Sequence, residues 1–262
     1  MRFKISLISS LCVGFILLLF KLGLSFANSG LEYNLIFGIV CLISIFLIVI
    51  SCGMIPKNDL QQILNFGKNQ LLGILSFCIC GAFVWCAYAF KNDVAPDDLK
   101  KQYFVMFFIS CLTAISFLVS SISHFLGKNF FKSMPILAFI PVIYFLISLT
   151  LFLSFDIGLP NAYNLTAQSL LTLFFVYYTQ IFVNCVEKIN IPKRLVVFGF
   201  PAIFATLSFT IPTIFSSTSL TSVSIATSVA HTFLIVYIFS FLVQNNGLSK
   251  IFNKSKSLNL KI

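Results

Sequence analysis

The chain has 262 residues, of which 59% are hydrophobic and only 9% carry a charge. Because an average soluble domain is about 25% charged, this composition excludes an ordinary soluble protein, a disordered chain and a secreted disulfide scaffold. The 17 Lys or Arg residues outnumber the 7 Asp or Glu residues, which gives a formal net charge of +10.

Long apolar runs separated by short polar breaks dominate the chain. A helix needs about 20 apolar residues to cross the hydrocarbon core of a bilayer. We therefore predict an all-α, polytopic integral membrane helix bundle with eight transmembrane helices. The predicted spans cover about residues 5–26, 35–55, 71–90, 103–125, 134–155, 165–186, 195–215 and 221–243. The segments between them are too short for another folded domain, so residues 1–262 are predicted to form a single transmembrane domain.

The basic residues predict how the chain is threaded. If the N-terminus is cytoplasmic, thirteen Lys or Arg residues fall in cytoplasmic segments and only Lys91, Lys100 and Lys101 fall outside. Since Lys and Arg near span ends are retained in the cytoplasm, both termini are predicted to be cytoplasmic, and the plasma membrane is the expected location. The basic tail, 244–262, and the other cytoplasmic segments are expected to attract anionic lipid and not nucleic acid.

The first predicted span also fits a signal peptide. A basic start is followed by an apolar stretch to Phe20 and by the small-x-small sequence Ser25-Phe26-Ala27. Lys21 interrupts the apolar stretch, which favours an uncleaved span. Cleavage would leave seven helices and an outside N-terminus.

A faint repeat links two of the predicted cytoplasmic segments. Gly67-Lys68-Asn69 recurs as Gly127-Lys128-Asn129, each time before a span that runs outward. Helical hairpins repeated in parallel would produce this pattern, as in some transporters. The alternative is that Lys and Asn are simply common at inner membrane boundaries.

The fourth predicted span carries polar residues on one face. Thr113, Ser116, Ser120 and His124 recur at steps of three and four residues. Ser120 and His124 are candidate ligand-binding residues, although His124 can also be explained as an interfacial residue at the inner boundary.

The sixth predicted span has the clearest polar stripe, which contains Tyr177, Gln180 and Asn184. Polar side chains are costly against lipid, so this stripe is expected to face the bundle interior or a water-filled cavity. We interpret these three residues as candidate ligand-binding residues. Hydrogen bonds between helices are the alternative explanation.

The seventh predicted span contains Pro201 and Pro212, which predict a kink. The eighth contains His231 near its midpoint. Because an ionisable residue at that depth is a functional hypothesis by default, His231 is a candidate site residue. By depth alone, Tyr144, Tyr177 or Tyr178 could reach it. A neutral histidine bonded to a neighbouring hydroxyl is the alternative.

The chain contains few residues suited to chemistry. All eight Cys lie in predicted spans, where they are expected to act as small apolar residues. No phosphate-binding glycine loop, metalloprotease helix or nucleophile elbow occurs, so we predict no catalytic residue, metal site or cofactor.

The leading hypothesis is a permease that binds or moves a small solute through a cavity lined by the fourth, sixth and eighth spans. One alternative is a non-transporting module, such as a subunit bound to another membrane protein, a sensor or an anchor. The other alternative is a membrane-embedded enzyme in which His124 or His231 acts as acid or base.

Overall fold

The computed structural model describes residues 31–53, 68–93, 99–154, 159–184, 190–210 and 221–244. These residues form helices and contain no strand, as the all-α prediction requires. The described helices are α2 (Leu31–Gly53), α3 (Gln70–Asn92), α4 (Lys100–Leu126), η3 (Phe130–Lys132), α5 (Pro135–Ser154), α6 (Leu159–Asn184), α7 (Asn190–Ala205), η4 (Thr206–Thr210) and α9 (Ser222–Gln244). The first predicted span and the tail beyond Gln244 lie outside the described residues.

Four of the described helices contain a segment that is long and apolar enough to cross a bilayer. These segments are Gln70–Asn92, Lys100–Leu126, Leu165–Val183 and Ser222–Leu242. Helices α2 and α5 contain shorter apolar segments, and α7 ends after 16 residues where the chain enters the π-helix η4. Each predicted span from 35–55 onward overlaps a described helix, but the number eight and the orientation of the termini stay predictions.

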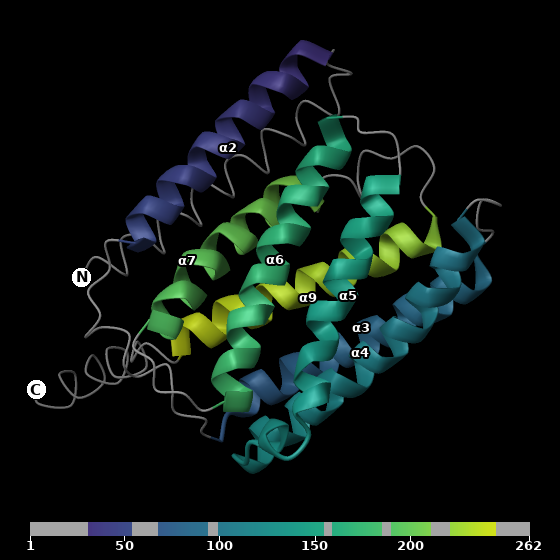
Figure 1. The fold of residues 1–262 in the computed structure, drawn as a ribbon, viewed down its shortest axis with the longest axis vertical. Coiled ribbons are helices and arrows are strands. Elements are labelled where there is room, and N and C mark those ends of the chain that lie inside the picture. Colours follow the sequence, from purple (N-terminus) through teal and green to yellow (C-terminus); the bar gives the residue numbers. More distant parts are fainter. Residues whose placement is uncertain are drawn as a thin grey trace, which may run out of the picture.

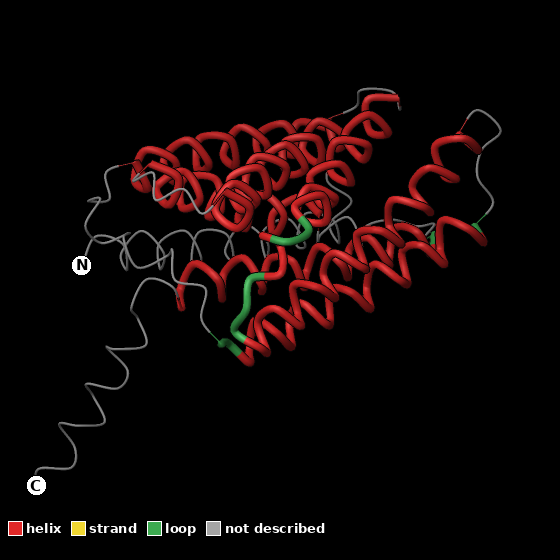
Figure 2. The backbone as a smooth tube through the Cα atoms, turned by 60° about the horizontal axis from the view of Figure 1, so that its bottom comes forward, coloured by secondary structure: helices red, strands yellow, loops and turns green. Residues whose placement is uncertain are grey.

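The helices form an up-and-down bundle in which α9 crosses behind α5 and α6 (Figures 1 and 2). The N-terminal ends of α3, α5 and α7 lie at the same end of the bundle as the C-terminal ends of α4 and α6. We call this the basic end, because five described Lys and Arg residues lie there: Lys68, Lys128, Lys132, Lys193 and Arg194.

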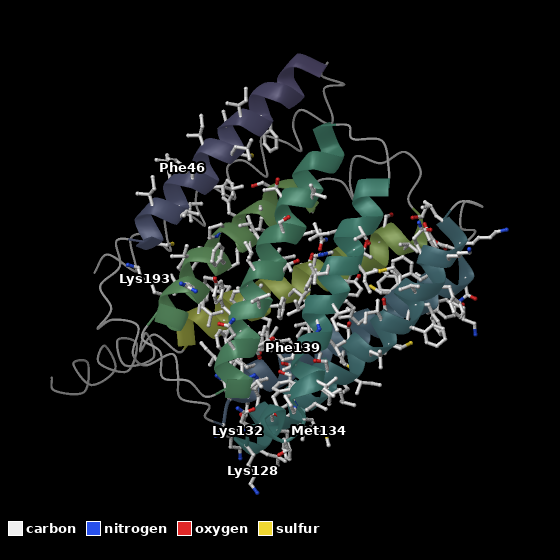
Figure 3. The ribbon with its side chains drawn as sticks, viewed as in Figure 1. Phe46, Lys128, Lys132, Met134, Phe139 and Lys193 are labelled. Carbon is white, nitrogen blue, oxygen red and sulfur yellow. The ribbon has the colours of Figure 1, made fainter. Side chains whose placement is uncertain are left out.

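The outer surface of the bundle is apolar. Phe46, Phe77 and Ile136 are 65%, 60% and 76% exposed, and many other large hydrophobic side chains of α2 to α5 also face outward (Figure 3). A soluble monomer rarely exposes an apolar surface of this extent. The surface and the four long apolar helices are consistent with a membrane protein.

Helix α9 is held in the centre by contacts with several helices. It packs against α3, α7 and η4, and its side chains form hydrogen bonds with α4 and α6. Gly199 of α7 permits one of these close approaches, since a Cβ atom there would lie 2.7 Å from Leu242 Cδ1. The position of α9 brings polar residues of three helices together inside the bundle.

At the basic end, the Asn residue of each Gly-Lys-Asn motif acts as a helix cap. Asn69 Oδ1 accepts a hydrogen bond from Leu72 N at the start of α3, and Asn129 Oδ1 accepts one from Phe131 N at the start of η3. Gly127 adopts the left-handed conformation (φ 67°) that ends α4. Capping alone therefore accounts for the recurrence of Asn at these two positions.

At the opposite end, Asp93 joins α3 to α9. Its Oδ1 accepts a hydrogen bond from Ser222 Oγ at 2.5 Å, and its Oδ2 accepts one from Val223 N at 3.0 Å. A carboxylate at this position satisfies a free N–H group and interacts favourably with the positive end of the helix dipole.

We expect Asp93→Ala to lower the free energy of unfolding by about 1 kcal/mol, because α9 loses its N-terminal cap. Amide exchange of the first turn of α9, measured by mass spectrometry, should become faster. Asp93→Asn keeps an acceptor oxygen and should show a smaller effect. Unchanged exchange around Val223 in the alanine variant would contradict this role.

Candidate functional site

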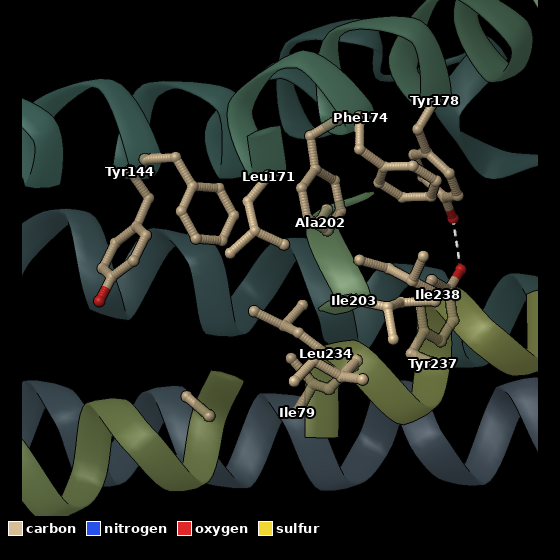
Figure 4. Close-up of a cluster of buried hydrophobic side chains, with 14 of the residues drawn as sticks. Ile79, Tyr144, Leu171, Phe174, Tyr178, Ala202, Ile203, Leu234, Tyr237 and Ile238 are labelled. Atoms are coloured by element: carbon tan, nitrogen blue, oxygen red, sulfur yellow. Dashed lines mark hydrogen bonds between the residues drawn. The ribbon is translucent and has the colours of Figure 1, made fainter. Parts of the chain in front are cut away.

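Two buried polar groups lie along α9, and the first is centred on Tyr237. Its hydroxyl lies 2.5 Å from Tyr178 Oη of α6 and 3.1 Å from His124 Nε2 of α4. Figure 4 shows the two tyrosines facing each other across the interface. None of the three side chains is more than 5% exposed. We call these residues the histidine–tyrosine cluster.

Serine hydroxyls extend the histidine–tyrosine cluster to α3. Ser76 Oγ of α3 lies 3.3 Å from Ser120 Oγ of α4, and both hydroxyls lie beside the Tyr237 hydroxyl. Ser120 and His124 are one helical turn apart on α4, so both can reach the same point. The structure thus brings these two predicted residues together, and it buries His124 instead of leaving it at the bundle surface.

The second group is the pair formed by Gln168 of α6 and His231 of α9. Gln168 Nε2 lies 2.8 Å from His231 Nε2, and His231 Nδ1 lies 2.6 Å from Thr227 O. A carbonyl oxygen can only accept, so Nδ1 carries the proton and the lone pair of Nε2 accepts from the Gln168 amide. His231 is therefore a neutral imidazole with both nitrogens bonded.

Gln168 retains an acceptor that no described residue uses. Its side chain is 2% exposed, and its Oε1 atom is buried without a hydrogen-bond partner among the described residues. An amide oxygen in this state is costly inside an apolar bundle, because burial removes the hydrogen bond that the oxygen makes with water in the unfolded chain.

The π-helix η4 lies against α6 and α9. Within the described part of the chain, its Ser208 Oγ is also buried without a hydrogen-bond partner. Single π-helical turns inside longer helices frequently mark functional sites. Pro201 lies in α7 one turn before η4, whereas Pro212 falls outside the described residues.

Aromatic side chains separate the two polar groups. The Phe145 ring lies 6.1 Å from the His231 ring and stacks on Phe175 at 5.4 Å. Phe175 in turn lies 5.8 Å from Tyr178 of the histidine–tyrosine cluster. The two groups are thus joined by ring packing and by the backbone of α9.

Two of the predicted residues, Tyr177 and Gln180, are only half-buried. Tyr177 stacks on Phe198 of α7 at 5.4 Å, with the Arg194 guanidinium 5.4 Å from its ring centroid. Asn184 is the last residue of α6, and its side chain lies outside the described part of the chain.

Tyr144 and the tyrosines of α6 are not the hydrogen-bond partners found for His231. The Tyr144 ring packs edge-on against Phe83 at 4.8 Å, well apart from the Tyr178–Tyr237 pair in Figure 4. The partner is Gln168, which the predicted stripe omitted. Gln168 lies nine residues before Tyr177, which places it about 180° away around the helix.

The interior face of α6 carries Gln168, Thr172 and Thr179. Thr172 Oγ1 donates to Gln168 O, and Thr179 Oγ1 donates to Ala138 O of α5. Both hydroxyls are therefore used within the bundle, which leaves Gln168 as the residue of this face with an unused polar atom.

Comparison with family models, with curated proteins and with solved structures found no match for this chain. No three His, Cys, Asp or Glu side chains gather in a metal-binding arrangement within the described ranges. The function is therefore argued from the two buried polar groups and from the surface of the bundle.

Proposed function

We propose that the protein is a permease-type integral membrane protein of the plasma membrane, with both termini cytoplasmic, that binds and moves a small solute. The solute site lies between α6, η4 and α9, at Gln168 and His231. The proposal departs from the stripe predicted on α6, because it replaces Tyr177, Gln180 and Asn184 by Gln168.

The observation that carries the proposal is the unused Oε1 atom of Gln168. The amide nitrogen is committed to His231 at 2.8 Å, so the amide plane is fixed and the oxygen cannot rotate toward another donor without breaking that bond. A solute that donates a hydrogen bond would satisfy this oxygen. Ser208 Oγ supplies a second unused group on the adjacent η4.

The charge distribution supports a neutral solute. Among the described residues, the Lys, Arg and Asp side chains lie near the two ends of the bundle, and the buried polar groups are imidazole, amide and hydroxyl. An ion would need a counter-charge at this depth, because desolvating a charge in an apolar medium is expensive. The site is suited to a small uncharged molecule that carries a hydrogen-bond donor.

The alternative function is a non-transporting membrane module. The histidine–tyrosine cluster favours it, since hydroxyl and imidazole groups bonded across α4, α6 and α9 also serve to hold helices together. The two functions differ at Gln168, because a purely structural pair has no use for an open acceptor.

The test is extraction of the protein in native lipid, followed by mass spectrometry of everything that remains bound. We expect a small molecule to be retained, and Gln168→Leu to weaken its binding at least about tenfold, the cost of about one hydrogen bond. Thr232→Leu is the matched control, because Thr232 follows His231 on α9 but is exposed.

Equal retention by the Gln168→Leu and control proteins would refute the assigned site. Co-purification of a stoichiometric protein partner without any small molecule would refute the permease and support the module.

A further inference from the structure

Three lysines meet where α4 turns into α5. Lys68 precedes the N-cap of α3, Lys128 follows Gly127, and Lys132 ends η3. A Cβ atom at Gly127 would lie 3.1 Å from Lys68 N, so the two chain segments are in direct contact. Lys68, Lys128 and Lys132 are all exposed, and we call them the lysine cluster.

The backbone beneath the lysine cluster is fixed by several contacts. Asn129 Nδ2 donates to Phe182 O of α6 at 2.8 Å, which attaches the turn to the bundle. Phe131, in the middle of η3, is 2% exposed and anchors the turn from inside. Asn69 N donates to His124 O at 2.9 Å and holds the segment before α3 against α4. The charges are therefore presented from a rigid frame.

No acidic side chain balances the lysine cluster within the described residues. Asp93, whose carboxylate caps α9, lies at the opposite end of the bundle. Three positive charges that are held on a rigid turn create a positive potential, which attracts an anion.

An apolar rim borders the lysine cluster. Leu126, Met134 and Ile136 are 58%, 57% and 76% exposed and stand immediately before and after the turn. In Figure 3, Lys128, Lys132 and Met134 are labelled together at the basic end of the bundle. Positive groups next to exposed apolar side chains match the layering of a bilayer, in which phosphates lie just above the acyl chains.

We propose that the lysine cluster binds the phosphate headgroup of an anionic phospholipid, with the acyl chains against Leu126, Met134 and Ile136. The site rests on the membrane location in the proposed function but not on the solute site at Gln168. It narrows the general attraction of the basic segments for anionic lipid to one turn of the chain.

The test uses the full chain in nanodiscs that contain phosphatidylglycerol diluted in phosphatidylcholine. Phosphatidylglycerol that co-purifies with the protein is counted by native mass spectrometry. The first variant carries Lys68→Gln, Lys128→Gln and Lys132→Gln. We expect its affinity for phosphatidylglycerol to fall by about a hundredfold at low salt, the equivalent of about 1 kcal/mol for each of three charges.

Two matched variants control for folding and for net charge. Arg at the same three positions should retain the lipid. Gln at Lys91, Lys100 and Lys101 removes three charges from the opposite end and should also retain it.

Equal loss of lipid in the two Gln variants would overturn the proposal, as would full retention of lipid by the variant with Gln at Lys68, Lys128 and Lys132. Failure of the chain to enter nanodiscs would refute the membrane location. A chain that enters but shows no lipid preference would refute only the lipid site.

Discussion

Phe175→Ala is expected to lower the free energy of unfolding by about 3–5 kcal/mol. Phe175 is 1% exposed and contacts the rings of Phe117, Phe145, Phe174 and Tyr178. Truncation leaves a cavity in the aromatic layer between the two polar groups, and the surrounding rings cannot close it because they are anchored on α4, α5 and α6. The midpoint of an SDS titration, followed by helical circular dichroism, measures the loss.

Phe77→Ala is the matched control for this cavity. Phe77→Ala removes the same side-chain atoms on α3, but the Phe77 side chain is 60% exposed on the apolar outer surface. Lipid or detergent chains can fill the space that is left, so we expect a change within about 0.5 kcal/mol. Equal destabilisation by the two variants would show that the bundle does not pack as described.

Gly199→Val is expected to destabilise the protein by about 1–3 kcal/mol through overpacking. A Cβ atom at this position would already lie 2.7 Å from Leu242 Cδ1 and 3.2 Å from the Phe174 ring. Valine adds two methyl groups at the point where α7, α6 and α9 meet. The Leu242 side chain and the Phe174 ring must shift to accept them, and the SDS midpoint should fall.

Gly81→Val provides the control for helix propensity. Gly81 lies in α3, where a Cβ atom would meet nothing within 4 Å. The substitution therefore changes the backbone preference without a new contact, and we expect little effect or a slight gain in stability. If Gly199→Val behaves like Gly81→Val, α7 and α9 are not in close contact.

The positions of the helices along the chain were largely predictable, because length and hydropathy report directly on spans that must satisfy their own backbone hydrogen bonds. The run around 71–90 corresponds to α3, and the run around 221–243 corresponds to α9. The predicted span 195–215 matches the structure less closely, since the α-helix α7 ends at Ala205 and the chain continues as the π-helix η4.

The faces of the helices were harder to predict than their positions. In a soluble helix the apolar stripe marks the interior, but here both the outer surface and the core are apolar. The sequence therefore indicates only weakly which face of each helix points into the bundle. On α6 this shifted the prediction to Tyr177 and Gln180, whereas the buried amide belongs to Gln168. On α4 the spacing of Ser120 and His124 placed them on one face, and both are buried there with hydrogen-bonding neighbours on α3 and α9.

Pairings between distant helices were not predictable from one sequence. Nothing in the local pattern links Asp93 to the start of α9, or Gln168 to His231, because these contacts depend on how α9 crosses the bundle. Lone polar residues in apolar segments identify which side chains need partners, but they do not identify the partners.

The placement of both polar groups on α9 has a mechanical consequence. His231 and Tyr237 lie six residues apart on one continuous helix, and the His231 ring is fixed to that helix by Thr227 O. A rigid rotation of α9 would therefore separate His231 from Gln168 and Tyr237 from Tyr178 in the same step. The two contacts therefore act together as a single latch between α9 and α6.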